Sequence, residues 1–272
     1  AKVASDAADK NNTAAVQATQ VFDSRTSIEL SDVAAGNGGF VMQGQAEGDQ
    51  SGFSVSSAGD VNGDGIDDLI IGARGASRNG QEYNGSFYVV FGKKAINSPI
   101  KLSDIANGNG GFVIFGQSDR EHIGHSVSSA GDVNDDGIDD LIIGAPYAEP
   151  DGNIGYYAGL TFVVFGSRNF DSNITITDIT DGTGGFVING ISDSDFSGLS
   201  VSNAGDINGD GIDDLIVGAP YADPNLKSGA GKSYVVFGKK GHNSPIELSE
   251  IADGTGGFVI SGAAQSDFSG SS

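Results

Sequence analysis

Short apolar runs separated by turn-forming residues recur along the chain. Residues 54–56 alternate polar and apolar, residues 69–71 are apolar throughout, and further apolar runs cover 87–91 and 112–115. Runs of this length, bounded by Gly, Asn, Asp and Ser, are typical of β-strands. The uninterrupted run 69–71 suits a strand that is buried on both faces. The pattern therefore predicts a unit of four short strands.

This unit is repeated. A segment that begins Gly-Asp-Val-Asn-Gly-Asp-Gly at Gly59 has close copies that begin at Gly131 and Gly205, 72 and 74 residues further along. The connection between the third and fourth strands carries an Ile-x-Leu pattern, which predicts a small ordered insertion. The other landmarks of the repeat are Val-Val-Phe-Gly at 89–92, 163–166 and 235–238, Gly-Gly-Phe-Val around Phe40, Phe112, Phe186 and Phe258, and Ile28/Leu30, Ile100/Leu102, Ile174/Ile176 and Ile246/Leu248.

Four antiparallel strands in a unit too small to bury both of its faces indicate the blade of a β-propeller. A linear β-solenoid is the alternative, but its coils are shorter than 72 residues and do not need four strands each. We therefore predict an all-β chain built as a β-propeller of four-stranded blades, about half of a larger propeller.

The repeats also predict how the chain is divided. A polar N-terminal extension covers 1–14, a partial unit covers 15–50, and full units cover 51–122, 123–196 and 197–268, followed by the start of another unit at 269–272. Within the partial unit, residues 20–23 align weakly with the third strand. Because both ends fall inside a unit, we expect the segment to belong to a longer chain or to associate with a second copy.

Composition excludes several classes of function. With 14 Lys and Arg against 36 Asp and Glu, the net charge is −22, which repels nucleic acid and anionic lipid and attracts cations. The chain has no Cys, so thiol catalysis, thiolate metal sites and disulfides are excluded. No apolar run approaches the length that spans a bilayer. We therefore expect neither a nucleic-acid partner nor a membrane span.

The repeated loop that starts at Asp60 has the spacing of a cation site. Oxygen-bearing side chains stand at its positions 1, 3, 5 and 9, Gly stands at position 6, and the carbonyl of position 7 supplies a further oxygen. Such all-oxygen loops favour Ca²⁺ over Mg²⁺, which demands a stricter geometry. The loop is not an EF-hand, because position 12 is Ile71, Ile143 or Val217 where an EF-hand needs Glu, and no helical pattern flanks it.

A plain hairpin turn would explain one such loop, but three copies that keep the same positions favour calcium. We expect the Asp at position 8 (Asp67, Asp139 and Asp213) to point away from the cation, either behind the ligands as a supporting residue or toward solvent. Three calcium sites are predicted, with ligands Asp60, Asn62, Asp64, the Ile66 carbonyl and Asp68; Asp132, Asn134, Asp136, the Ile138 carbonyl and Asp140; and Asp206, Asn208, Asp210, the Ile212 carbonyl and Asp214.

With these loops the chain resembles the FG-GAP repeat of integrin α-subunit propellers and of many bacterial, notably cyanobacterial, surface proteins. Gly-Ala-Pro follows the second strand at 144–146 and 218–220, as in that family, although the first unit has Gly-Ala-Arg at 72–74. The Phe-Gly element appears as Phe196-Ser197-Gly198, and we place His125 and Phe53 in its variable slot. The resemblance implies a propeller of seven blades and a calcium-stabilised extracellular scaffold.

Other candidate chemistry is weak. The segment 52–56 lacks the last Gly of a G-x-S-x-G nucleophile elbow. His122 and His125 could suggest zinc, but the other units lack His at these positions, so packing or surface roles are favoured. Paired carboxylates do not by themselves exclude a glycosidase, yet most acids belong to the loops. The N-x-[ST] triplets at Asn11, Asn84 and Asn173 are expected by chance.

We therefore predict a non-enzymatic, secreted or cell-surface, calcium-binding scaffold for adhesion or surface assembly. Its expected partners are calcium and another protein, a surface glycan or a second copy of itself. Two alternatives stay open. The repeats could carry or flank a hydrolase such as a phospholipase, or they could be the structural unit of a self-assembling ring or filament.

Overall fold

The computed structural model describes residues 29–94, 99–149, 157–170 and 174–272, which fall into two compact units. The first unit comprises residues 1–41 and 97–99, and its described part contains the short helix α2 (Leu30–Ala34). The second unit contains every strand of the described chain. The predicted extension 1–14 and the weak strand match at 20–23 lie outside the described residues.

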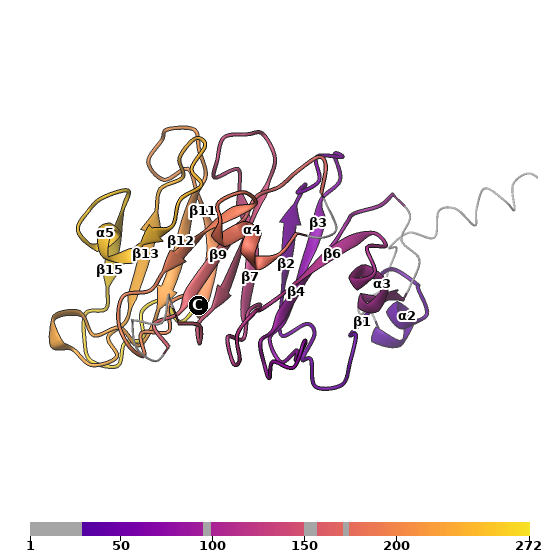
Figure 1. Cartoon of the computed structure of the whole chain (residues 1–272), viewed down its shortest axis with the longest axis horizontal. Coiled ribbons are helices and arrows are strands. Elements are labelled where there is room, and N and C mark those ends of the chain that lie inside the picture. Colours follow the sequence, from indigo (N-terminus) through magenta and orange to yellow (C-terminus); the bar gives the residue numbers. More distant parts are fainter. Residues whose placement is uncertain (1–28, 95–98, 150–156, 171–173) are drawn as a thin grey trace, which may run out of the picture. The chain divides into compact units, whose positions relative to one another are not determined.

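Three four-stranded antiparallel units follow one another in the second unit, and we call them blades 1, 2 and 3 (Figure 1). The predicted strands are confirmed, with bounds that differ from the predicted ones by one to three residues. The fold is therefore an all-β set of β-propeller blades. Blade 1 contains β2 (Ser54–Gly59), β3 (Asp68–Ala73), β4 (Ser86–Val90) and β6 (Gly111–Phe115); blade 2 contains β7 (Ser126–Gly131), β8 (Asp140–Ala145), β9 (Leu160–Val164) and β10 (Gly185–Asn189); and blade 3 contains β11 (Ser200–Gly205), β12 (Asp214–Ala219), β13 (Lys232–Val236) and β15 (Gly257–Ser261).

The hydrophobic core lies between successive blades. Alternate residues of one strand enter opposite clusters: Ile143 packs toward blade 1 with Ile70 and Phe87, whereas Ile142 packs toward blade 3 with Leu215 and Val217. The other face of blade 1 has its own cluster, which includes Ile71, Tyr88 and Leu102. The second strand of blades 1 and 2 is thus buried on both faces, as its apolar run predicts.

In blades 1 and 3, the described part of the insertion between the third and fourth strands pairs with the sheet before it. In blade 3, β14 (Ile246–Glu247) pairs in parallel with β10 of blade 2, and α5 (Leu248–Ala252) follows. In blade 1, β5 (Ile100–Lys101) pairs in the same way with β1 (Met42–Gln43), and α3 (Leu102–Ala106) follows. Because Leu102 and Leu248 are buried, each helix anchors its insertion to its own blade.

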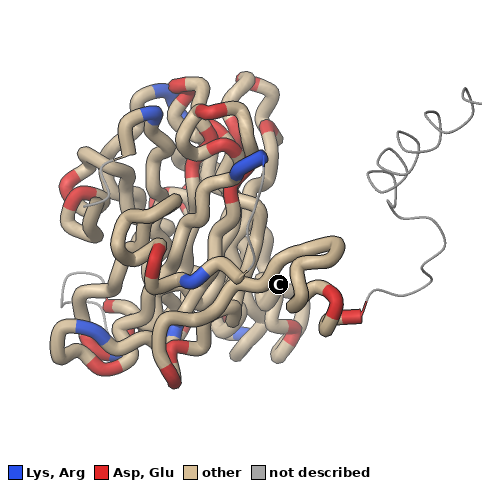
Figure 2. The backbone as a smooth tube through the Cα atoms, turned by 90° about the vertical axis from the view of Figure 1, so that its right-hand side faces the viewer, with Lys and Arg blue, Asp and Glu red and all other residues tan. Residues whose placement is uncertain are grey.

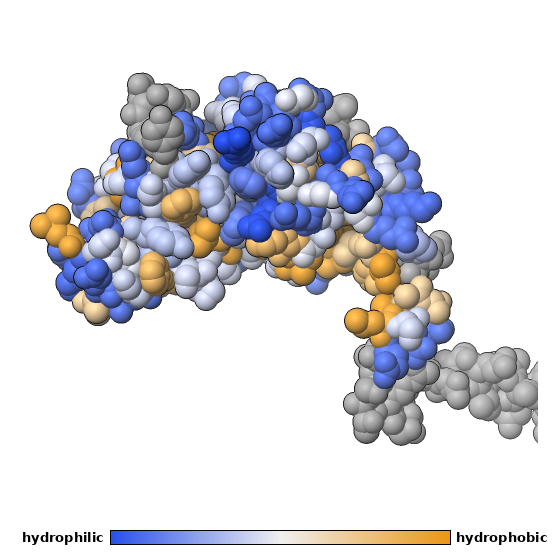
Figure 3. All heavy atoms as spheres, turned by 90° about the horizontal axis from the view of Figure 1, so that it is seen from below, coloured by the Kyte–Doolittle hydropathy of each residue, from blue (hydrophilic) through white to orange (hydrophobic). Residues whose placement is uncertain are grey.

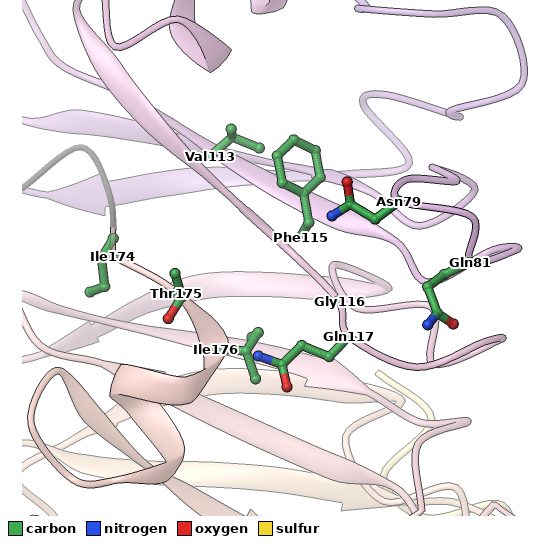
Figure 4. Close-up of a pocket in the computed structure, with 9 residues that line it drawn as sticks. All are labelled: Asn79, Gln81, Val113, Phe115, Gly116, Gln117, Ile174, Thr175 and Ile176. Carbon is green, nitrogen blue, oxygen red and sulfur yellow. The ribbon is translucent and has the colours of Figure 1, made fainter.

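Blade 2 departs from this arrangement. In its insertion, helix α4 (Ile176–Thr180) starts with a capping box between Thr175 and Asp178. The residues before α3 and α5 make no side-chain cap. Between the α4 start and β6 lies a pocket of about 470 Å³ instead of a parallel strand pair. Figure 4 shows Val113 and Phe115 on one side and residues 174–176 on the other. Across it, Gln117 Nε2 donates to Thr177 Oγ1 at 2.8 Å.

Candidate metal-binding loops

The three predicted loops connect the first and second strands of each blade. Their position-6 glycines, Gly65, Gly137 and Gly211, have φ of 87°, 83° and 90°, which L side chains rarely adopt. The sharp turn expected at this position is therefore present in all three blades. Figure 2 shows acidic residues gathered at the upper end of the blades, with Lys and Arg among them.

The carboxylates at positions 1 and 5 fold back onto their own loop. Asp60 accepts the N–H groups of Asp64 and Gly65 at 2.9 and 2.8 Å, and Asp64 Oδ1 accepts the N–H of Ile66 at 2.9 Å. Asp132 and Asp206 accept the equivalent pair of N–H groups, and Asp136 and Asp210 each accept the N–H of the following Ile, as Asp64 does. These bonds hold the acidic side chains on the inner side of the turn in each copy.

The middle loop differs from its two copies in the hydrogen bonding of the Asn at position 3. Asn62 and Asn208 accept the N–H of position 5 through Oδ1, at 2.9 and 2.8 Å. Asn134 is only 6% exposed, yet its Oδ1 has no hydrogen-bond partner in the described structure. A buried carbonyl oxygen without a donor costs free energy unless a further group satisfies it. A cation would be such a group.

The Asp at position 9 is fully buried in all three blades and ties the loop to the third strand. Asp68 accepts the N–H of Gly92 at 2.7 Å and that of Val61 at 3.2 Å, and Asp140 and Asp214 bond the equivalent groups. Burial, with a smaller contribution from the neighbouring loop carboxylates and against the two backbone hydrogen bonds, raises the pKa of Asp68 to about 6 and that of Asp140 to about 8. A cation beside these carboxylates would oppose that shift.

Position 7 contributes its backbone to the loop and its side chain to the blade. The Cγ2 atoms of Ile66, Ile138 and Ile212 lie under the Gly that follows the third strand. A Cβ on Gly92, Gly166 or Gly238 would come within 2.7 Å of that methyl group and within 2.3 Å of a position-8 carbonyl. This close approach explains the Gly of the Val-Val-Phe-Gly motif.

The aspartates at position 8 divide between the two expected places: two bond to the backbone of a predicted ligand residue, and one is exposed. That the bonded residue belongs to the preceding loop was not predicted. Asp139 Oδ2 accepts the N–H of Asp60 at 2.8 Å, and Asp213 Oδ2 accepts the N–H of Asp132 at 3.0 Å. Each of these side chains therefore bonds to the preceding blade, because stacking brings position 8 of one loop beside position 1 of the one before. Asp67 is exposed, as predicted.

Basic residues that follow the third strand also reach the preceding loop. The stem of Arg168 lies against Gly63, where a Cβ would come within 2.8 Å of its Cγ, and Lys240 Nζ pairs with Asp135 Oδ2 at 2.6 Å. Both residues follow a Phe-Gly at the end of a third strand, so the repeat itself was the signal that could have identified them.

The donor set fits a hard cation. Across the described residues, no three or more Asp, Glu or His side chains form a group that could hold a metal by themselves. The loops would complete such a site with amide and main-chain oxygens, which are ligands that Ca²⁺ accepts. The unpartnered Asn134 oxygen and the buried, mutually repelling carboxylates are the observations that agree with a bound cation.

Aromatic side chains run across the end of the blades opposite the loops. Seen from below, the surface carries hydrophobic residues scattered among hydrophilic ones (Figure 3). His122 lies at the φ-positive site shared by Gln50, Phe196 and Phe268, so His122, and not His125 or Phe53, occupies the variable slot of the Phe-Gly element. His125 packs against Phe53, and burial lowers its pKa to about 4. The continuous row of ring contacts comprises Phe53, His125, Tyr147, Phe196, Tyr221 and Phe268.

No helix in the part of the chain that the structure describes is long and apolar enough to cross a membrane. The family model of the FG-GAP repeat matches residues 51–90, 124–159 and 197–236, one match in each blade. Each match contains one predicted loop.

Several animal proteins are similar to the chain. Integrin alpha pat-2 of Caenorhabditis briggsae is 31% identical over 232 residues, which cover 82% of this chain and 17% of that protein. Integrin alpha-6 of Gallus gallus is 37% identical over 124 residues, or 45% and 10% of the two chains. Human phosphatidylinositol-glycan-specific phospholipase D is 30% identical over 177 residues, or 63% and 19%. The matched segment thus spans less than a fifth of each relative. Three repeats in three blades, together with these relatives, show that the chain belongs to the FG-GAP, integrin-α-like family.

Proposed function

We propose that the three loops bind Ca²⁺ and that the chain is a calcium-stabilised extracellular scaffold for adhesion or surface assembly. The observation that carries the proposal is the recurrence of one oxygen set on one backbone geometry in three blades, with the buried Asn134 Oδ1 lacking a donor. The side chains at positions 1, 3, 5 and 9 and the carbonyl at position 7 would hold each ion.

The charge of the chain supports this proposal. At a net charge of −22, the folded chain repels itself, and each loop brings several carboxylates together. Ca²⁺ would supply the missing positive charge and would bind the folded loops more tightly than the unfolded chain. The ion would therefore stabilise the fold by mass action.

The role in adhesion follows from the integrin α relatives and is a proposal for this chain. A protein or a surface glycan would be the partner, and the half-exposed Phe53, Tyr83 and Tyr221 offer ring faces for such a contact. We place the protein in a secreted or cell-surface setting on the same grounds. Self-assembly with a second copy is compatible with this reading.

Calorimetry and thermal melts test the calcium proposal. We expect about three Ca²⁺ per chain with dissociation constants of roughly 10⁻⁴–10⁻³ M, and a melting temperature that falls in EDTA. The matched control is the triple variant Asp60→Ala, Asp132→Ala, Asp206→Ala, which should show neither effect. A wild-type chain without calcium heat and with a melt indifferent to EDTA would refute the proposal.

The similarity to phosphatidylinositol-glycan-specific phospholipase D favours one second candidate, a repeat region within a hydrolase. Incubation of the chain with a phosphatidylinositol-glycan and calcium, followed by detection of released phosphatidic acid, tests it. We expect no release from this chain. Release that persists in the triple variant would show an activity separate from the loops.

A further inference from the structure

We propose that Asp139 and Asp213 are positioning residues for the calcium loop of the preceding blade, so that the affinity of each loop depends on the blade that follows it. This inference rests on the proposed calcium binding and adds a regulation of those sites. It concerns residues at position 8, which are not ligands in the predicted set.

The contact is close and is repeated at both blade boundaries. Asp139 Oδ2 lies 2.8 Å from the N of Asp60, and Asp213 Oδ2 lies 3.0 Å from the N of Asp132. In each case the bonded residue is the first ligand of the preceding loop. A Cβ on Gly59 or Gly131 would lie 2.3 or 2.1 Å from the same carboxylate oxygen, so only Gly permits the approach.

The following blade also covers the loop with its backbone. After β9, the N–H of Ser167 donates to the Val61 carbonyl at 2.9 Å. After β13, the N–H groups of Lys239 and Gly241 donate to the carbonyls of Val133 and Asn134 at 3.0 and 2.9 Å. This cover buries the Asn134 side chain, whose unpartnered Oδ1 is an independent indication of a ligand at the middle loop.

We call the loops of blades 1, 2 and 3 loops 1, 2 and 3. Loop 3 has the same backbone turn as the other two, but no described blade packs beside it. Gly205 keeps its φ of 68°, but no atom lies within 4 Å of the position where its Cβ would be. Residues 206–210 are all exposed, and the Asp206 N–H makes no hydrogen bond with any described residue. Loop 3 therefore serves as an internal reference for loops 1 and 2.

Two physical effects link this contact to cation binding. The hydrogen bond fixes the backbone of position 1, which reduces the ordering that the loop must undergo when it binds. The carboxylate also adds a negative charge beside the loop, which attracts a cation. Loops 1 and 2 should therefore bind Ca²⁺ more tightly than loop 3.

Amide NMR of the full chain can resolve the three loops. The N–H groups of Gly65, Gly137 and Gly211 each donate to the position-1 carboxylate of their own loop, at 2.8, 2.8 and 2.9 Å, so each reports on one site. Titration with CaCl₂ to about 10 mM covers the affinity range of extracellular calcium modules. The measured quantity is the calcium midpoint at each glycine.

The variants are Asp139→Ala and Asp213→Ala, with Asp67→Ala as the matched control at the same loop position. We expect Asp139→Ala to raise the midpoint at Gly65 roughly tenfold, the loss typical of a charge-assisted hydrogen bond, and to leave Gly211 unchanged. Asp213→Ala should do the same to Gly137. Asp139→Asn, which keeps an acceptor oxygen, should recover part of the midpoint shift at Gly65.

The outcomes separate the two proposals. If no glycine amide responds to calcium in the wild-type chain, the proposed function fails and this inference with it. If the wild type responds but Asp139→Ala leaves the Gly65 midpoint unchanged, only the inference fails. It also fails if Asp67→Ala shifts Gly65 as strongly, or if Asp139→Ala shifts all three glycines equally, because the effect would then not pass between blades.

Discussion

At the scale of single residues, the adjacent aspartates at positions 8 and 9 of the repeated loop have different surroundings. Asp140 is fully buried and accepts two backbone N–H groups, its neighbour Asp139 is partly buried and accepts one from the preceding blade, and Asp67 is exposed. The free energy that each contributes to folding should follow the number of buried N–H groups that it satisfies.

This order predicts the cost of replacing each residue. In EDTA, we expect Asp140→Ala to lower the free energy of unfolding by about 2–3 kcal/mol, Asp139→Ala by about 1 kcal/mol and Asp67→Ala by less than about 0.5 kcal/mol. Urea denaturation measures all three. Equal losses for Asp67→Ala and Asp140→Ala would contradict the bonding described for these loops.

Asp195, which lies outside the loops, gives a prediction about pH. It is buried, and desolvation raises its pKa to about 6, with the charges of Asp223 and Asp193 adding to the effect and Lys232 opposing it. The folded state thus holds this proton more tightly than the unfolded state. The resulting stabilisation is complete below about pH 4 and is lost as the pH rises to about 6.

Asp195→Asn should remove that part of the decline in stability between pH 4 and pH 6. The exposed Asp253 offers a matched control, because its charge is not among those that act on Asp195 and Asp253→Asn should leave the slope unchanged. Melting temperatures measured across this pH range in EDTA decide the matter. A slope that is the same in the wild type and in Asp195→Asn would assign the pH dependence to other groups.

At the scale of elements, neighbouring blades are joined at the end opposite the loops. Ser126 Oγ donates to the Gly198 carbonyl at 2.8 Å, and a Cβ on Gly144 would lie 1.9 Å from that same oxygen. The arrangement recurs with Ser54 and Ser200. The Gly of the Gly-Ala-Pro motif is therefore required by close approach of the next blade rather than by a turn.

Gly144→Ala should accordingly push blade 3 away from β8. We expect a loss of about 3 kcal/mol or more in the free energy of unfolding, since the clash is with backbone that cannot rotate away. Gly254→Asn is the control, because Gly254 has φ of 87° and open space around it, and Asn tolerates such a conformation. Chemical denaturation that finds both variants equally stable would show that the blades can separate at no cost.

At the scale of the whole molecule, blade 3 exposes a sheet face whose equivalents in blades 1 and 2 are buried. Ile260 is 50% exposed, whereas the equivalent Ile114 and Ile188 are 1% and 0% exposed. Phe258 and Ile207 are likewise 39% and 51% exposed at positions that are buried in the earlier blades. An apolar sheet face of this kind is a template for association.

We expect the 272-residue chain to associate through this face, with a scattering mass above 27.5 kDa that rises with concentration. Ile260→Lys should shift the mass toward the monomer, because it places a charge in the contact. Leu226 is 99% exposed and belongs to the connection between β12 and β13 rather than to a strand of the face, so Leu226→Lys should leave association unchanged. A concentration-independent monomer in calcium would contradict this expectation.

Much of this protein follows from its sequence alone, because the determining interactions are local. Alternation, apolar runs and turn residues predict every blade strand, and the spacing from Asp60 to Asp68 places the acidic loop correctly between the first and second strands. The order of strands within a blade also follows from short connections. Even the insertion is recognisable, since its Ile-x-Leu pattern recurs with the unit.

Only the tertiary structure decides what one blade does to the next. The bond between Asp139 and Asp60 joins residues 79 positions apart, and that between Asp213 and Asp132 joins residues 81 apart. The local pattern at position 8 is the same in all three loops, yet Asp67 is exposed while its two copies bond across a blade boundary. The difference arises from stacking, which sets one loop beside another and is not encoded in the period of either.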